Sequence, residues 1–188
     1  MMNLAYNIAY RGKKWKNIMK PTDIYILRDL ENAQSVSDVI KEKGFHLEHR
    51  ILNLEVIESN RFISRMLKVP LASRVLHLRK LRVVEGVPKS IDRTYILYEK
   101  VKGIEDADFA HESFYKIIRD RFGYMTHKSE EEILIVEASE EEQRLLDCRD
   151  KELMMIRGTT YKEEPEPFEY FEIVSVSDFY RFRSVSKQ

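Results

Sequence analysis

The sequence predicts an α+β fold in which helices flank one antiparallel β-sheet. Two runs of alternating apolar and polar residues surround a turn at Gly86 and Pro88, a pattern typical of a β-hairpin. The last third of the 188-residue chain also matches the middle third at a shift of 79 positions. The matched positions are Ile57 with Val136, Leu67 with Leu146, and Pro88 with Pro167. We therefore predict a pseudo-duplicated strand–helix–hairpin unit whose two copies pair into one sheet.

The first copy comes after a short strand at 24–28 and a short helix. Ser35 is a typical N-cap and Gly44 a typical C-terminal stop, so the residues between them are predicted to be that helix. The first copy then comprises a strand at 51–57, a helix at 62–67, and a hairpin of strands at 75–84 and 89–97. In the strand at 51–57, alternation places Leu52, Leu54 and Val56 on one face.

The second copy comes after the most amphipathic helix of the chain. That helix is predicted from Ser113, as its N-cap, to Gly123, with Phe114, Ile117 and Ile118 on its apolar face. The second copy then has a strand at 133–136, a helix at 140–146 with an acidic first turn, and strands at 153–161 and 168–176. We expect the Ser113 helix to pack on one face of the sheet.

Composition excludes several functional classes. Lys and Arg together number 32 and equal Asp and Glu, so no overall charge attracts nucleic acid or an anionic membrane. One cysteine, Cys148, excludes an internal disulfide, and the five scattered histidines indicate no metal site. No apolar run is long enough to span a membrane, and the N-terminus lacks the apolar core of a signal peptide. We therefore expect a cytoplasmic protein without a metal or cofactor.

The N-terminal 34 residues differ in pattern from the rest of the chain. Five basic residues between Arg11 and Lys20 surround Trp15. They are either a solvated N-terminal arm or part of a contact with nucleic-acid phosphates.

One candidate site lies on the central hairpin. Lys80 and Arg82 share one face of the first strand at a spacing of two residues. If Asp92 of the returning strand faces the same side, the sheet presents two cations beside a carboxylate, which suits an anion that also carries a hydroxyl or amine. A solvated strand face with weak ion pairs is the alternative.

A second candidate is the start of the Ser113 helix, with Tyr115 two residues later. A serine there either caps a backbone N–H only or contributes to an anion site with the free amides of the first turn. The acidic clusters 130–132 and 140–142 show no paired-carboxylate arrangement, and no nucleophile or phosphate-loop motif occurs, so we predict no catalytic residue.

From about Ser35 to Phe182, the sequence resembles the UTRA domain, the effector-binding domain of GntR-type repressors of the HutC subfamily. Five stretches in the family's order support the resemblance. They are Ser35–Gly44, Leu76–Arg82 with Gly86–Tyr95, Ser113–Tyr115, Pro167–Tyr170 and Asp178–Phe182.

The resemblance implies a chorismate-lyase-like fold, dimerisation through this domain, and a small anionic effector such as a sugar phosphate or a small carboxylic acid. The family's ligand contacts fall here on Lys80, Arg82, Asp92, Ser113, Tyr115 and Glu169. This chain departs from the family at three positions. Lys80 and Val176 stand where many family members carry arginine, and Asp92 stands where the longer glutamate is usual.

The resemblance also implies two domains in the family, of which one is expected here. Residues 1–34 lack a complete winged helix-turn-helix, and residues 35–188 form the predicted ligand-binding domain. DNA would therefore be reached only through a DNA-reading domain outside this chain; either the chain is a truncated product or it acts without such a domain. Two alternatives to an effector sensor are a lyase-type enzyme and a ligand-free dimerisation partner of full-length repressors.

Overall fold

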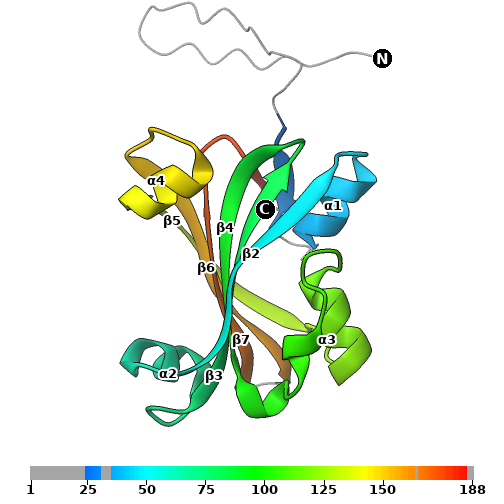
Figure 1. The fold of residues 1–188 in the computed structure, drawn as a ribbon, viewed down its shortest axis with the longest axis vertical. Helices are drawn as coiled ribbons and strands as arrows, with labels where there is room; N and C mark the ends of the chain where they lie inside the picture. Colours follow the sequence, from blue (N-terminus) through cyan, green and yellow to red (C-terminus); the bar gives the residue numbers. More distant parts are fainter. Residues whose placement is uncertain (1–23, 31–34, 164, 186–188) are drawn as a thin grey trace, which may run out of the picture.

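A computed structural model describes residues 24–30, 35–163 and 165–185 of the chain (Figure 1). The basic run around Trp15 lies outside the described residues. The helices are α1 (Val36–Glu42), α2 (Arg61–Leu67), α3 (Phe114–Phe122) and α4 (Glu140–Leu146), with 3₁₀ turns η1 (Tyr98–Lys100) and η2 (Ile104–Asp106). The strands are β1 (Ile26–Asp29), β2 (Leu47–Glu58), β3 (Arg74–Val84), β4 (Val87–Leu97), β5 (Lys128–Glu137), β6 (Glu152–Glu163), β7 (Glu166–Ser175) and β8 (Tyr180–Arg183).

The predicted duplication is confirmed by the order of the strands. Six antiparallel strands form one sheet in the order β2-β3-β4-β7-β6-β5, so the units β2-α2-β3-β4 and β5-α4-β6-β7 meet at their last strands. Helix α2 of the first unit packs on β7 of the second, and α4 of the second unit packs on β4 of the first. Each unit therefore supplies the helix that covers the other unit's central strand.

Helices cover both faces of the sheet. Figure 1 shows α2 and α4 on one side and α1 and α3 on the other. Because successive side chains of a strand point to opposite faces, Leu78 of β3 packs in a cluster with Ile117 of α3, whereas Leu81 packs in a cluster with Leu146 of α4. The α1/α3 face is the one that carries the candidate site.

Local sequence signals determine the ends of the elements. The Ser35 Oγ accepts a hydrogen bond from the Asp38 backbone N at 3.4 Å, and Gly123 ends α3 with φ at 62°. The β3–β4 turn consists of Glu85 and Gly86, with φ values of 50° and 77°, as a two-residue hairpin turn requires. The turn is shorter than predicted, because Pro88 belongs to β4 and not to the turn. Pro88 pairs with Val83 of β3, next to a shift of register between Arg82 and Val83.

One predicted alternation is wrong. Leu52 and Leu54 lie on opposite faces of β2, since Leu54 packs with the α3 cluster and Leu52 with the α4 cluster. The cause is a shift of register between Ile51 and Asn53, where a β-bulge inserts one extra residue and reverses the side-chain directions beyond it.

The strand predicted at 24–28 is β1. It pairs in parallel with β8, near the C-terminal end of the described chain, with Arg28 opposite Phe182. Strand β1 thus precedes residue 35, where the sequence suggested that the ligand-binding domain begins. None of the helices in the described ranges is long and apolar enough to cross a membrane.

Candidate functional site

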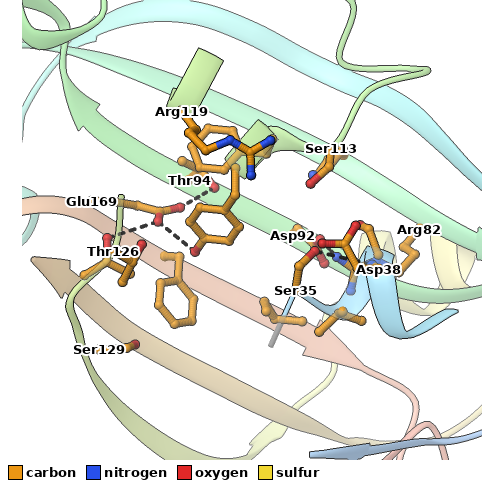
Figure 2. A pocket seen from close by; sticks show the side chains of 18 of the residues that line it. Ser35, Asp38, Arg82, Asp92, Thr94, Ser113, Arg119, Thr126, Ser129 and Glu169 are labelled. Atoms are coloured by element: carbon orange, nitrogen blue, oxygen red, sulfur yellow. Dashed lines mark hydrogen bonds and ion pairs between the residues drawn. The ribbon is translucent and has the colours of Figure 1, made fainter. Parts of the chain in front are cut away.

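A cavity of about 330 Å³ lies between the sheet and helices α1 and α3 (Figure 2). All six residues proposed from the sequence line it, namely Lys80, Arg82, Asp92, Ser113, Tyr115 and Glu169. The sheet register explains how three of them, Lys80, Asp92 and Glu169, meet. Lys80 of β3 is opposite Asp92 of β4, and Ile96 of β4 is opposite Glu169 of β7, so these residues share one face across three strands.

Arg82 and Asp92 form a closed polar cluster at one end of the cavity. The Arg82 Nη2 donates to the Asp92 Oδ2 at 2.6 Å, and its Nη1 donates to the Tyr180 hydroxyl at 2.8 Å. The second oxygen of Asp92 accepts from the Ser90 hydroxyl at 2.8 Å. Both terminal nitrogens of Arg82 thus have partners within the protein, although its Nε has none, and this arginine positions Asp92 and Tyr180.

Lys80 is a cavity-lining cation without an ion-pair partner among the described residues. Its side chain is only 6% exposed, and within the described ranges it has no hydrogen bond or ion pair. Its Nζ lies 5.8 Å from the ring centroid of Phe114, the first residue of α3, which places the ammonium near the start of that helix. Burial lowers the pKa of Lys80 to about 8, against the opposing attraction of Asp92. An anion would relieve this desolvated charge.

The hydroxyl of Ser113 is not used for capping. The N-cap side chains of the other α-helices in the described chain, Ser35, Asn60 and Ser139, each accept a backbone N–H, whereas Ser113 does not. Ser113 is buried and lines the cavity. The first-turn amides of α3 therefore lack a capping side chain and present a partial positive charge near Lys80.

Glu169 occupies the opposite end of the cavity in a ring of hydroxyl groups (Figure 2). It accepts hydrogen bonds from Thr94 at 3.1 Å, from Tyr115 at 3.0 Å and from Thr160 at 3.3 Å. Burial raises the pKa of Glu169 to about 7, although these hydrogen bonds oppose the shift. A carboxyl group that is partly protonated at neutral pH can accept from or donate to a ligand hydroxyl or amine.

Sequence reasoning missed Arg28 of β1 and Arg119 of α3, which also line the cavity. Arg28 donates from Nη2 to Glu131 of β5 at 3.0 Å. Arg119 lies one helical turn after Tyr115, and this spacing could have identified it. No local pattern identifies Arg28, because the β1–β8 pairing joins segments that are far apart in the sequence.

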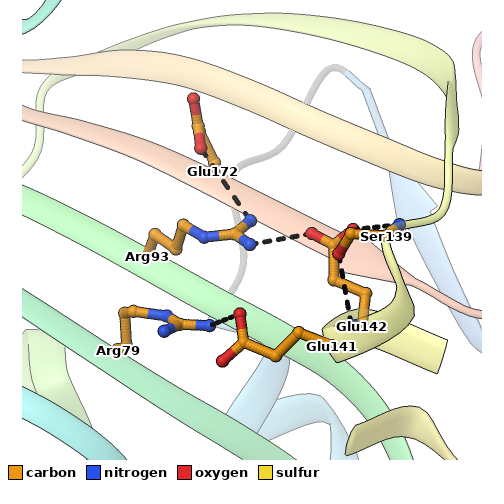
Figure 3. A network of polar contacts seen from close by, with 6 residues as sticks. All are labelled: Arg79, Arg93, Ser139, Glu141, Glu142 and Glu172. Atoms are coloured by element: carbon orange, nitrogen blue, oxygen red, sulfur yellow. Dashed lines mark hydrogen bonds and ion pairs between the residues drawn. The ribbon is translucent and has the colours of Figure 1, made fainter. Parts of the chain in front are cut away.

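The acidic cluster 140–142 lies in α4, on the side of the sheet away from α1 and α3 (Figure 1), and Figure 3 shows the contacts of Glu141 and Glu142. Glu142 completes a capping box with Ser139 and accepts from the Arg93 Nη2 at 2.7 Å. Glu141 accepts from the Arg79 Nη2 at 3.2 Å, and Glu172 lies 3.9 Å from the Arg93 Nη1. These contacts join α4 to β3, β4 and β7, so the cluster contributes to packing on the face away from the cavity.

Residues 42–181 match the UTRA domain family. The chain belongs to this family. The match extends from the last residue of α1 into β8 and includes all six proposed site residues, whereas Arg28 precedes it. The structure likewise resembles solved domains of this kind. The effector domain of PhnF from Mycobacterium smegmatis superposes with a TM-score of 0.78 at 18% identity, over 87% of this chain and 100% of that domain.

Two curated relatives of this UTRA chain are transcriptional regulators of Bacillus subtilis. It is 23% identical to GmuR over 136 residues, which are 72% of this chain and 56% of GmuR. It is 21% identical to the repressor NagR over 154 residues, which are 81% of this chain and 63% of NagR. The chain thus spans less than two thirds of the length of either regulator.

Proposed function

We propose that this UTRA chain is the effector-sensing domain of a bacterial GntR-family transcriptional regulator. Its cavity binds a small anionic metabolite, either a sugar phosphate or a small carboxylic acid. The observation that carries the proposal is the buried and unpaired ammonium of Lys80, beside the uncapped start of α3. The Lys80 ammonium is attracted by Asp92 and Glu169 but forms no hydrogen bond to either, so a ligand of opposite charge would compensate its desolvation.

The two ends of the cavity suggest how a ligand is oriented. An oxyanion would accept hydrogen bonds from Lys80, the Ser113 hydroxyl and the first amides of α3. A hydroxyl or amine elsewhere on the ligand would bind Glu169, whose ring of hydroxyls can adjust to a donor or an acceptor. A ligand with both groups is therefore favoured over a simple anion.

Regulation would act through an assembly. We propose a cytoplasmic homodimer in which the effector shifts the balance between two arrangements, and in which DNA is bound through a winged helix-turn-helix domain outside this chain. The difference in effector affinity between the two arrangements sets the size of that shift. The names of GmuR and NagR, both regulators of transcription, support this part of the proposal.

Isothermal titration calorimetry against phosphorylated sugars and small carboxylic acids tests the proposal. We expect at least one compound to bind, and we expect Lys80→Met to weaken its binding by about a hundredfold, as for a lost charge-assisted contact. The matched control is Lys151→Met, because Lys151 is exposed and lies outside the cavity. Equal affinities in the two variants would contradict the assignment of the site.

An enzyme is the second candidate, because the buried Glu169 has a pKa near neutrality. Acid–base chemistry also requires a second titratable group. Asp92 is already bound to Arg82 and Ser90, so that group would be Lys80, whose pKa is lowered to about 8. Incubation with chorismate, followed by assay for 4-hydroxybenzoate, tests this candidate. Turnover that is lost in Glu169→Gln would favour the enzyme over the sensor.

A further inference from the structure

Arg28 lies outside both the UTRA match and the ligand-binding domain predicted from the sequence, yet it reaches the cavity. In the part of the chain that the structure describes, six buried side-chain polar atoms have no hydrogen-bond partner. Two of them belong to residues that line the cavity, the Arg28 Nη1 and the Arg82 Nε. Of this pair, the Nη1 of Arg28 is a terminal nitrogen with two N–H donors.

Among the described residues, one of the two terminal nitrogens of Arg28 has a hydrogen-bond partner. Its Nη2 donates to the Glu131 Oε1 at 3.0 Å, and its side chain is 15% exposed. The positive charge of Arg28 also opposes the rise in the pKa of Tyr180, which indicates that it lies near the hydroxyl that Arg82 binds. Arg28 therefore lies close enough to Tyr180 to act on the polar cluster of Arg82 and Asp92.

We propose that Arg28 is a ligand-binding residue, whose Nη1 binds an oxyanion of the effector and so couples occupancy of the cavity to the position of β1. This inference rests on the proposed function, because it requires that the cavity binds a ligand. A carboxylate or phosphoryl oxygen suits this nitrogen, since a buried guanidinium nitrogen without an acceptor is unfavourable and a charge-assisted hydrogen bond removes that penalty.

Strand β1 is attached to the domain through β8 and α1. It pairs with β8, its Ile26 N donates to the Phe179 carbonyl at 2.7 Å, and the Ile26 side chain packs in the core beside α1. A ligand that binds Arg28 would add a further attachment on the sheet side. The coupling is reciprocal: displacement of β1 would weaken ligand binding, and ligand binding would stabilise the position of β1. The position of β1 would thus depend on the effector through one side chain.

Titration of the full 188-residue chain with inorganic phosphate tests the proposal, with acetate in a parallel arm that distinguishes a phosphoryl from a carboxylate preference. Binding is followed by NMR, together with hydrogen exchange of the Ile26 and Leu30 amides, which donate to the C-terminal segment. We expect the ion to slow exchange at both amides, and we expect Arg28→Gln to weaken binding about tenfold and to abolish that slowing. Arg50→Gln, at an exposed arginine paired with Glu48, should match the parent chain.

The outcomes separate this inference from the proposed function. Parent-like affinity and parent-like slowing in Arg28→Gln, together with loss of binding in Lys80→Met, would overturn the role of Arg28 and retain the cavity as a ligand site. Binding that is unaffected by either substitution would overturn both the role of Arg28 and the proposed ligand site. Because Arg28→Gln could also loosen β1 by itself, Glu131→Gln provides a second comparison. It removes the ion pair but leaves Nη1 available, so it should retain most of the ion affinity.

Discussion

Arg82 and Asp92 form an ion pair on adjacent strands, with 2.6 Å between the Nη2 and the Oδ2 and side-chain exposures of 6% and 8%. Removal of one partner leaves the other as a buried charge without its ion-pair partner. We therefore expect Arg82→Met or Asp92→Leu alone to lower the free energy of unfolding by about 3–5 kcal/mol. The double variant should lose much less than the sum of the two, which a double-mutant cycle in urea would measure. Additive losses would contradict a coupled pair.

Ser113 and Ser139 both precede helices but should respond differently to alanine. Ser139 completes a capping box, so Ser139→Ala should lower the free energy of unfolding by about 1 kcal/mol. Ser113 makes no capping hydrogen bond, so Ser113→Ala should change stability little and instead weaken effector binding about fivefold to tenfold. Thermal denaturation and calorimetry measure the two effects. A larger loss of stability in Ser113→Ala than in Ser139→Ala would argue for capping alone.

Glu169 should make stability depend on pH below neutrality. Its pKa is about 7 in the folded chain, compared with an ordinary value of 4.5. The folded state thus binds the proton more tightly, and the stabilisation is complete below pH 4.5 and is lost as the pH rises through 7. The loss is on the order of 3 kcal/mol. Urea denaturation of the parent chain and of Glu169→Gln should show this decline in the parent chain and not in the variant. The same dependence of stability on pH in both proteins would be evidence against a raised pKa of Glu169.

Lys80 should cost stability in the absence of ligand. Burial lowers the pKa of Lys80 from 10.5 to about 8. Between these two pH values the folded chain releases the proton before the unfolded chain does, so the free energy of unfolding of the parent chain should rise with pH in this range. At about pH 7 we expect Lys80→Met to increase the free energy of unfolding by about 2 kcal/mol. The same variant should lose effector binding. A less stable Lys80→Met would show that the ammonium has a partner in the folded chain.

Patterns that act over a few residues predicted most of the elements. The caps Ser35 and Ser139 and the terminal glycine Gly123 mark helix ends by contacts with their own neighbours. The alternating runs of the two hairpins, with the matching spacing of the two halves, were enough to predict one sheet. Alternation failed in β2, since the bulge at Leu52 depends on how β3 pairs with it.

The sequence predicted which residues line the candidate site but not which of them are paired with one another. Family resemblance selected six residues that the fold brings to one cavity. It could not reveal that Arg82 is bound by Asp92 and Tyr180, or that Lys80 has no ion-pair partner among the described residues. Tyr180 lies 98 positions from Arg82, and no pattern within one strand encodes that contact.

The sequence by itself therefore determined the order of the helices and of most strands, that two similar units share one sheet, and which side chains could bind an anion. Those properties depend on backbone capping and on side-chain alternation, which involve neighbours in the chain. Only the tertiary structure decided which buried arginine nitrogens lack a hydrogen-bond partner and that Arg28 of β1 lines the cavity. Pairing and burial depend on residues brought together from distant segments, so charge availability is a property of the folded chain.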